Sequence, residues 1–134
     1  MMTKLFISYS SRDAELAARL EASIEALGSS VYNPLREMTP GSDFRKSIQA
    51  AIRRSDALIA IVSSPDSAAN SWISYELGMA EAAGKDVLIV ATQDYGVKDL
   101  PSDLAGWKIV HFDPDRTDLA ARQIVDQLSS AARA

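Results

Sequence analysis

Residues 57–62, Ala57-Leu58-Ile59-Ala60-Ile61-Val62, form the longest uninterrupted apolar stretch of the chain. A continuous run of this kind, without alternating polar positions, is typical of a β-strand that is covered on both of its faces. The segment Ser63-Ser64-Pro65 follows directly and is expected to end the strand. Strands covered on both faces belong to parallel sheets between two layers of helices, so this stretch predicts the centre of an α/β protein.

Segments on either side of this strand continue the pattern. Further strands are expected at residues 5–7, 31–32, 87–90 and 107–112. A first helix is expected before Gly28, because apolar residues recur at 16, 20, 24 and 27. A second helix is expected from Ser42 or Asp43, with an apolar face at Phe44, Ile48, Ala51 and Ile52. Two more are expected between about Ser71 and Gly84 and from about Asp115. The alternation predicts a flavodoxin-like, doubly wound, five-stranded parallel sheet of order 2-1-3-4-5 with helices on both faces. We expect residues 1–134 to form a single domain.

The composition limits the class of protein. Of the 134 residues, 47% are hydrophobic and 24% are charged, which is typical of a globular chain. Cysteine is absent, so disulfides and thiolate metal sites are excluded, and we expect a cytoplasmic protein. The net charge of −4 argues against a nucleic-acid partner, and the longest apolar stretch is far too short to span a membrane. We expect no metal site, because no cluster of residues suits one.

A ligand site is expected at one edge of this sheet. Open doubly wound sheets bind ligands at the carboxyl ends of their strands, where the strand order reverses, and here this point lies between the first and third strands. Its walls are residues 8–13, 34–43 and 63–76. Trp72 and Glu76 lie four residues apart, so a helix places them on the same face. The topology therefore brings this pair near two cations, Arg12 and Arg36.

Three sequence motifs fall on these walls. They are Phe6-Ile7-Ser8-Tyr9-Ser10 with Asp13, Arg36-Glu37-Met38-Thr39-Pro40-Gly41, and Ser71-Trp72-Ile73-Ser74-Tyr75-Glu76-Leu77. In this order and spacing they resemble three signatures of the Toll/interleukin-1 receptor (TIR) domain family: the opening strand, a loop of the form Arg-Asp-x-x-Pro-Gly, and the Ser-x-x-x-x-Glu run with Trp of enzymatic TIR domains.

The resemblance extends from about Thr3 to Val90 and has two departures. Glu37 stands in place of the aspartate of the loop motif. The Phe-Trp motif that receptor TIR domains carry near the last helix is missing, and Trp107 is only a loose counterpart.

What this resemblance implies is cleavage of NAD+. TIR domains that carry this glutamate split the bond between nicotinamide and ribose, and they release nicotinamide with ADP-ribose or a cyclic ADP-ribose. Many bacterial members do so in defence against phage, and TIR enzymes often stay dormant until a partner assembles them. The resemblance therefore implies a bacterial enzyme that uses NAD+ as substrate, needs no cofactor, self-associates with other TIR domains and responds to an attached or separate sensor.

By the same resemblance, Glu76 is the expected catalytic residue. Substrate-binding roles are expected for Ser8, Tyr9, Arg12, Arg36, Ser71 and Trp72, while Pro40 and Gly41 are expected to influence assembly and the product formed. The chemistry agrees independently, because nicotinamide is already cationic in NAD+ and its departure needs no proton donor. One acid is enough, and Glu76 would hold the ribose hydroxyls and stabilise the positive charge that develops on the anomeric carbon.

Each feature also has a structural interpretation. Glu76 can be one more solvated helix charge, Trp72 a core residue and Arg36 an exposed loop cation. Residues 40–41 can serve only to shape a turn, and the serines after the first strand, above all Ser11, can cap the first helix. The chain can also be a non-catalytic module for contacts between TIR domains, or an enzyme similar to nucleoside deoxyribosyltransferases, which share this fold style and a catalytic glutamate.

Overall fold

The computed structural model describes residues 3–34, 44–64, 71–92 and 108–133. Its centre is one parallel sheet of order β2-β1-β3-β4-β5, which confirms the predicted order. The strands are β1 (Lys4–Ser8), β2 (Ser30–Tyr32), β3 (Ala57–Val62), β4 (Asp86–Thr92) and β5 (Lys108–Phe112). The order reverses at β1 and β3, where Ser8 at the end of β1 lies opposite Ala60.

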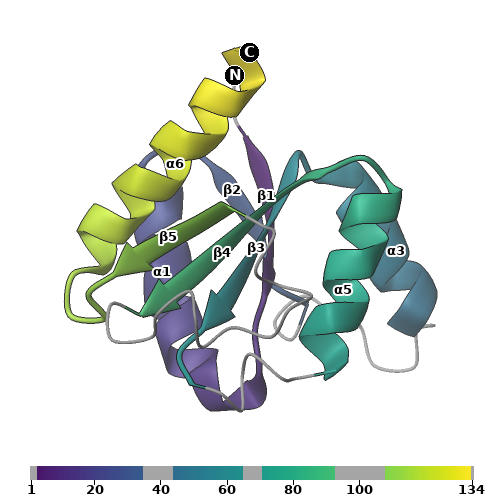
Figure 1. Ribbon diagram of the computed structural model, residues 1–134, viewed down its shortest axis with the longest axis horizontal. Coiled ribbons are helices and arrows are strands. Elements are labelled where there is room, and N and C mark those ends of the chain that lie inside the picture. Colours follow the sequence, from purple (N-terminus) through teal and green to yellow (C-terminus); the bar gives the residue numbers. More distant parts are fainter. Residues whose placement is uncertain (1–2, 35–43, 65–70, 93–107, 134) are drawn as a thin grey trace.

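Helices cover both faces of the sheet (Figure 1). The described helices are the short 3-10 helix η1 (Ser11–Asp13) and the α-helices α1 (Ala14–Ala26), α3 (Phe44–Arg54), α5 (Ser71–Ala82) and α6 (Thr117–Arg133). Helices α1 and α6, on the left of the view, pack on one face, and α3 and α5 pack on the other. The fold is therefore the expected α/β architecture. No described helix is both long and apolar enough to cross a membrane.

Two apolar cores, one on each face of the sheet, explain why β3 is apolar throughout. The first core, against α1 and α6, contains Ile59 and Ile61. The second core, against α3 and α5, contains Leu58, Ala60 and Val62. Successive side chains of a strand point to opposite faces, so a strand between two cores needs an apolar residue at every position. All six residues of β3 are buried accordingly.

Two helices end near the glycines predicted to stop them. Gly28 and Gly84 have φ angles of 97° and 72°, a conformation that glycine adopts readily because it has no Cβ. One detail of the prediction is wrong. The apolar spacing predicts Leu27 on the buried stripe of the first helix, but Leu27 follows the last residue of α1 and is 43% exposed.

The expected capping of the first helix by Ser11 is not observed. Ser11 starts η1, and α1 begins only at Ala14. The residues in the N-cap positions are Ser10 for η1 and Asp13 for α1, and neither side chain makes a capping hydrogen bond. Both side chains are buried at the carboxyl edge of the sheet instead. The polar turn after β1 therefore belongs to the interior at this edge.

Candidate active site

Ser8 and Glu76 meet at the carboxyl end of β1. Ser8 is the last residue of β1, and Glu76 lies in the second turn of α5. The Ser8 hydroxyl donates a hydrogen bond of 2.6 Å to Oε1 of Glu76, and both residues are fully buried. The contact places the predicted catalytic carboxyl beside the point where the strand order reverses.

The surroundings of Glu76 are largely apolar. Its neighbours on the buried side of α5 are Ile73, Leu77 and Ala80, which belong to the second core. Burial disfavours the charged form of a carboxyl and raises the pKa of Glu76 to about 8, while the hydrogen bond from Ser8 lowers it. Among the described residues, nothing donates a hydrogen bond to the second oxygen, Oε2. Burial in this setting therefore favours the neutral form of the Glu76 carboxyl.

A second polar contact lies at the same edge of the sheet. Asp13, at the end of η1, accepts a hydrogen bond of 2.5 Å from the hydroxyl of Ser63, which follows β3. Within the described part of the chain, Oδ2 of Asp13 and Oγ of Ser10 are buried without a hydrogen-bond partner. The segments that follow β1 and β3 are thus tied together, and the segment after β1 carries buried polar atoms that a ligand or a water molecule can satisfy.

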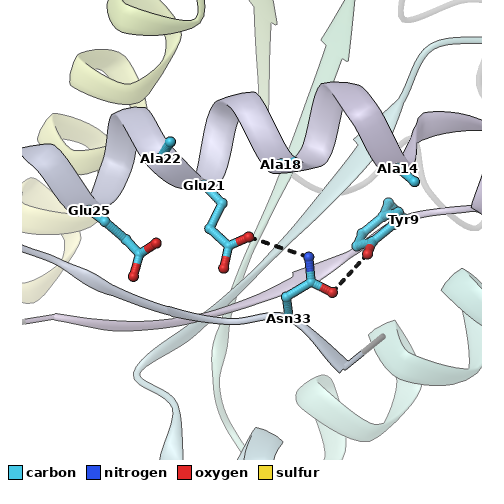
Figure 2. Close-up of a pocket in the computed structure, with 7 residues that line it drawn as sticks. All are labelled: Tyr9, Ala14, Ala18, Glu21, Ala22, Glu25 and Asn33. Atoms are coloured by element: carbon cyan, nitrogen blue, oxygen red, sulfur yellow. Dashed lines mark hydrogen bonds between the residues drawn. The ribbon is translucent and has the colours of Figure 1, made fainter. Parts of the chain in front are cut away.

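The side chain of Tyr9 lies on the other face of the sheet from Ser8. Its ring belongs to the first core, and its hydroxyl donates a hydrogen bond of 2.7 Å to Oδ1 of Asn33. The Asn33 amide donates a longer bond of 3.4 Å to Glu21 of α1. Figure 2 shows these three side chains at a cavity of about 420 Å³, which Glu25 also lines. Of these two predicted site residues, Ser8 therefore contacts Glu76, whereas the side chain of Tyr9 does not lie near it.

The other predicted site residues are placed less completely. Trp72 is partly buried against the second core, and its ring centroid lies 5.5 Å from that of Tyr75. Trp72 is thus in part a core residue, and its role in substrate binding stays a prediction. Arg12 is exposed in η1. The remaining predictions lie outside the described residues: Arg36, Pro40, Gly41, Trp107 and the side chain of Ser71.

Three polar residues of these contacts were not predicted from the sequence. They are Glu21, Asn33 and Ser63. The sequence signal for Glu21 is its place next to Leu20 on the buried side of α1, where a carboxyl needs a polar partner. Ser63 and its partner Asp13 lie on two of the predicted walls of the site, residues 63–76 and 8–13, but their contact joins positions 50 residues apart and was not itself predicted.

Solved structures share this fold over most of the chain. The TIR domain of the Toll-related receptor TRR-2 from Hydra magnipapillata is 22% identical at a TM-score of 0.76, over 93% of this chain and 97% of that chain. A metazoan TIR-STING receptor from C. gigas is 24% identical at a TM-score of 0.69 over 87% of this chain, which spans 38% of that receptor. A 2-deoxyribosyltransferase from Bacillus psychrosaccharolyticus is 17% identical at a TM-score of 0.67, over 87% of this chain and 90% of the enzyme. At these identities the likeness shows the fold alone.

A family model provides the sharper comparison. None of the curated protein sequences compared with this chain matches it. The model described as TIR domain, in contrast, matches residues 5–129, from β1 into α6. The match also covers residues after Val90, where the resemblance of the motifs ended. Because it includes nearly the whole chain, and because the sheet has the strand order expected for the fold, this protein belongs to the TIR domain family.

Proposed function

We propose that this TIR domain cleaves NAD+ at the bond between nicotinamide and ribose, with Glu76 as its catalytic residue. The observation that carries the proposal is the contact between Ser8 and Glu76, which holds a buried carboxyl at the carboxyl end of β1. Ligands of doubly wound sheets bind at this edge, and carboxyls with a strongly raised pKa cluster at active sites. The expected products are nicotinamide and either ADP-ribose or a cyclic ADP-ribose.

The reaction needs one carboxylate and no proton donor. When the N-glycosidic bond breaks, its electron pair moves to the pyridinium nitrogen, so nicotinamide leaves as a neutral molecule. The ribose carbon becomes cationic, and a deprotonated Glu76 beside it stabilises this charge. Attack by water then yields ADP-ribose and a proton. Attack by a group of the same molecule in place of water yields a cyclic product instead, and the attacking group then gives up its proton.

The other proposed substrate contacts come from both sides of the point between β1 and β3 where the strand order reverses. The two phosphates would meet the guanidinium of Arg12, which is exposed after β1, and backbone amides of the same turn. Arg36 would supply a second cation. The accessible part of Trp72 offers a surface for a ring or a ribose, and Ser71 offers a hydroxyl to the ribose.

The burial of Glu76 bears on how a substrate would reach it. Its side chain is fully buried, so a substrate can touch the carboxyl only after neighbouring groups have moved. A cationic pyridinium ring beside the carboxyl would then favour its charged form. A carboxyl that substrate reaches only after such a movement suits an enzyme that is active only when assembled. We propose that self-association with other TIR domains, started by an attached or separate sensor, opens the site in bacterial defence signalling or NAD+ depletion.

Release of nicotinamide tests the proposal. The purified chain is incubated with NAD+ at high protein concentration, both alone and fused to an oligomerising scaffold, and the products are separated by chromatography with mass detection. We expect Glu76→Gln to lower the rate by on the order of 10²-fold or more. Glu81→Gln removes an exposed carboxyl from the same helix and should keep the wild-type rate. Equal rates for wild type and Glu76→Gln would contradict the proposal.

Two other functions have their own outcomes in this experiment. The fold is shared with a 2-deoxyribosyltransferase, so release of a free base from deoxynucleosides, but not of nicotinamide from NAD+, would give Glu76 a different substrate. A non-catalytic interaction module would release no product in either format. In that case, loss of TIR–TIR association on substitution of Pro40 would identify the surface that the module uses.

A further inference from the structure

We propose that Ser8 is a positioning residue for Glu76: its hydroxyl holds one oxygen of the Glu76 carboxyl at the end of β1 and leaves the other oxygen for the substrate. The inference rests on the proposed role of Glu76 in cleavage. It differs from the expectation that Ser8 contacts the substrate, because the Ser8 hydroxyl is already used. It donates to Oε1 of Glu76 at 2.6 Å, and both side chains are fully buried.

Ser8 is well placed to fix the carboxyl in space. It belongs to β1, which lies between β2 and β3 in the sheet, and it lies opposite Ala60 of β3. Its backbone position is therefore set by strand pairing. Glu76 is carried by α5, which packs on β3 and β4. A hydrogen bond from a paired strand to a helical side chain thus joins two elements of fixed position.

The two oxygens of Glu76 have different surroundings. Oε1 accepts the hydrogen bond from Ser8. Oε2 is also buried, but no donor reaches it among the described residues. A carboxylate can accept hydrogen bonds on both oxygens, so Oε2 is the one to which a ribose hydroxyl can donate once the site opens. The geometry thus divides the carboxyl into a held oxygen and a reacting oxygen.

The groups that face Glu76 come from the helices and strands packed around it, and the charged residue Lys46, in the first turn of α3, is exposed. The residues that α3, β3 and β4 contribute to the second core around Glu76 are apolar. After β1, Arg12 is exposed and Asp13 accepts a hydrogen bond from Ser63. On α5, Tyr75 is exposed and its ring lies near that of Trp72. Burial, which raises the pKa of Glu76, and the Ser8 hydrogen bond, which lowers it, therefore dominate the titration of this carboxyl.

The positioning role has a consequence that a packing role lacks. A donor to a carboxylate stabilises its charged form, so removal of the Ser8 hydroxyl should raise the pKa of Glu76 further. The charged form is the one that the proposed reaction uses. The acid limb of the pH–rate profile should therefore move to higher pH in a Ser8→Ala variant. Loss of packing that admits water to the carboxyl would instead lower the pKa of Glu76, because water stabilises the charged form, and would move the acid limb to lower pH.

The experiment measures the titration of Glu76 directly. Glutamate labelled with ¹³C at the carboxyl is incorporated, and the Glu76 signal is assigned by its absence in Glu76→Gln. We expect Ser8→Ala to titrate at higher pH than wild type, and Ser8→Thr, which keeps a hydroxyl, to return toward the wild-type value. Ser10→Ala is the matched control, because Ser10 is also buried after β1 but its hydroxyl has no hydrogen-bond partner among the described residues. Unchanged titration in Ser8→Ala, or an equal shift in Ser10→Ala, would overturn the inference.

The pH–rate profile of nicotinamide release separates this inference from the proposed function. If nicotinamide is released by wild type but Ser8→Ala has the same titration and the same profile, the proposed function stands and the positioning role is wrong. If the carboxyl titration shifts but no variant or assembly releases nicotinamide, the Ser8–Glu76 coupling is real. The proposed reaction is then wrong, and with it the role of Oε2 toward a ribose.

Discussion

Ser8 and Tyr9 are neighbours in the chain, yet they lead to two different buried glutamates on opposite faces of the sheet. Ser8 donates directly to Glu76 of α5 in the second core. Tyr9 belongs to the first core and reaches Glu21 of α1 through Asn33. Both glutamates are at least nine-tenths buried. The two glutamates differ in what surrounds them.

Glu21 lies in a polar chain at the wall of a cavity, together with Tyr9, Asn33 and Glu25 (Figure 2). Glu76 has one hydrogen-bond donor among the described residues and apolar neighbours in the second core. Low polarity penalises the charged form of a carboxyl, and a pKa raised to about 8 follows for Glu76. Glu76 thus combines burial, apolar surroundings and a place at the carboxyl edge of the sheet, which are the features that make it the candidate catalytic carboxyl.

The largest effect that would test this comparison is on the pH dependence of stability. Folded Glu76 keeps its proton up to about pH 8, the value to which burial raises its pKa, whereas the unfolded chain releases the proton near the ordinary value of 4.5. The stabilising contribution of Glu76 is therefore complete below pH 4.5 and is lost as the pH rises to about 8. A pKa difference of one between the folded and unfolded chain corresponds to about 1.4 kcal/mol, so the free energy of unfolding should fall by roughly 4 kcal/mol over this range.

Urea denaturation of wild type and the Glu76→Gln variant across this pH range, at matched ionic strength, measures how far the free energy of unfolding falls. The variant has no carboxyl to ionise at this position, so most of the dependence should disappear and the variant should be the more stable protein at the alkaline end. The Glu81→Gln variant, changed on the exposed side of α5, should show the same decrease in the free energy of unfolding with pH as wild type. Identical slopes for wild type and Glu76→Gln would show that Glu76 ionises in a more polar setting than the structure has.

A smaller effect is expected on the opposite face. Asn33→Ala removes the link between Tyr9 and Glu21 and leaves both groups without this partner. Loss of buried hydrogen bonds of this kind costs about 1–3 kcal/mol, so the urea midpoint should fall at constant slope with denaturant. The ¹³C titration of Glu76 should stay at the wild-type pH, because the two networks lie on different faces. A shift of that titration would show that the faces are coupled through β1.

Much of the fold could be predicted from the sequence because local patterns and topology agree. The unbroken apolar run of β3 requires a core on each face, and two cores are present. Gly28 and Gly84 occupy left-handed positions near the ends of α1 and α5, as their places in the pattern indicate. Leu27 is misleading because its spacing fits the helical stripe, although the chain has already left α1 at that point.

The site was predictable in its parts but not in its contacts. Ser8 and Glu76 are identified from separate motifs, and their hydrogen bond joins residues 68 positions apart, which depends on strand pairing and on how α5 packs. The alternation of side-chain direction along β1 bears on the substrate-binding role predicted for Tyr9. Since Leu5 and Ile7 face the first core, Tyr9 must face it too, away from Ser8. Arg36, Pro40 and Gly41 lie outside the described residues and stay predictions.

The smallest expected effect concerns the two helices that carry these glutamates. Helix α1 has alanines at positions 14, 18 and 22, whereas α5 has Gly78 at an exposed position in its interior. A Cβ built at Gly78 would meet no atom within 4 Å. Glycine inside a helix costs about 0.5–1 kcal/mol relative to alanine, so Gly78→Ala should raise the free energy of unfolding, measured by urea denaturation, by about this amount.

Gly84→Ala provides the opposite control for that variant. A Cβ at Gly84 also has open space, but the backbone there has φ 72°, which an alanine adopts only with strain. Gly84→Ala should therefore destabilise the protein, although neither substitution creates a steric overlap. The Gly78→Ala variant should keep the wild-type titration of Glu76, because it strengthens α5 without touching the carboxyl or Ser8. If Gly78→Ala instead shifts the titration of Glu76, the surroundings of this carboxyl depend on the stability of α5. The raised pKa is then a property of the whole helix rather than of the residues next to the carboxyl.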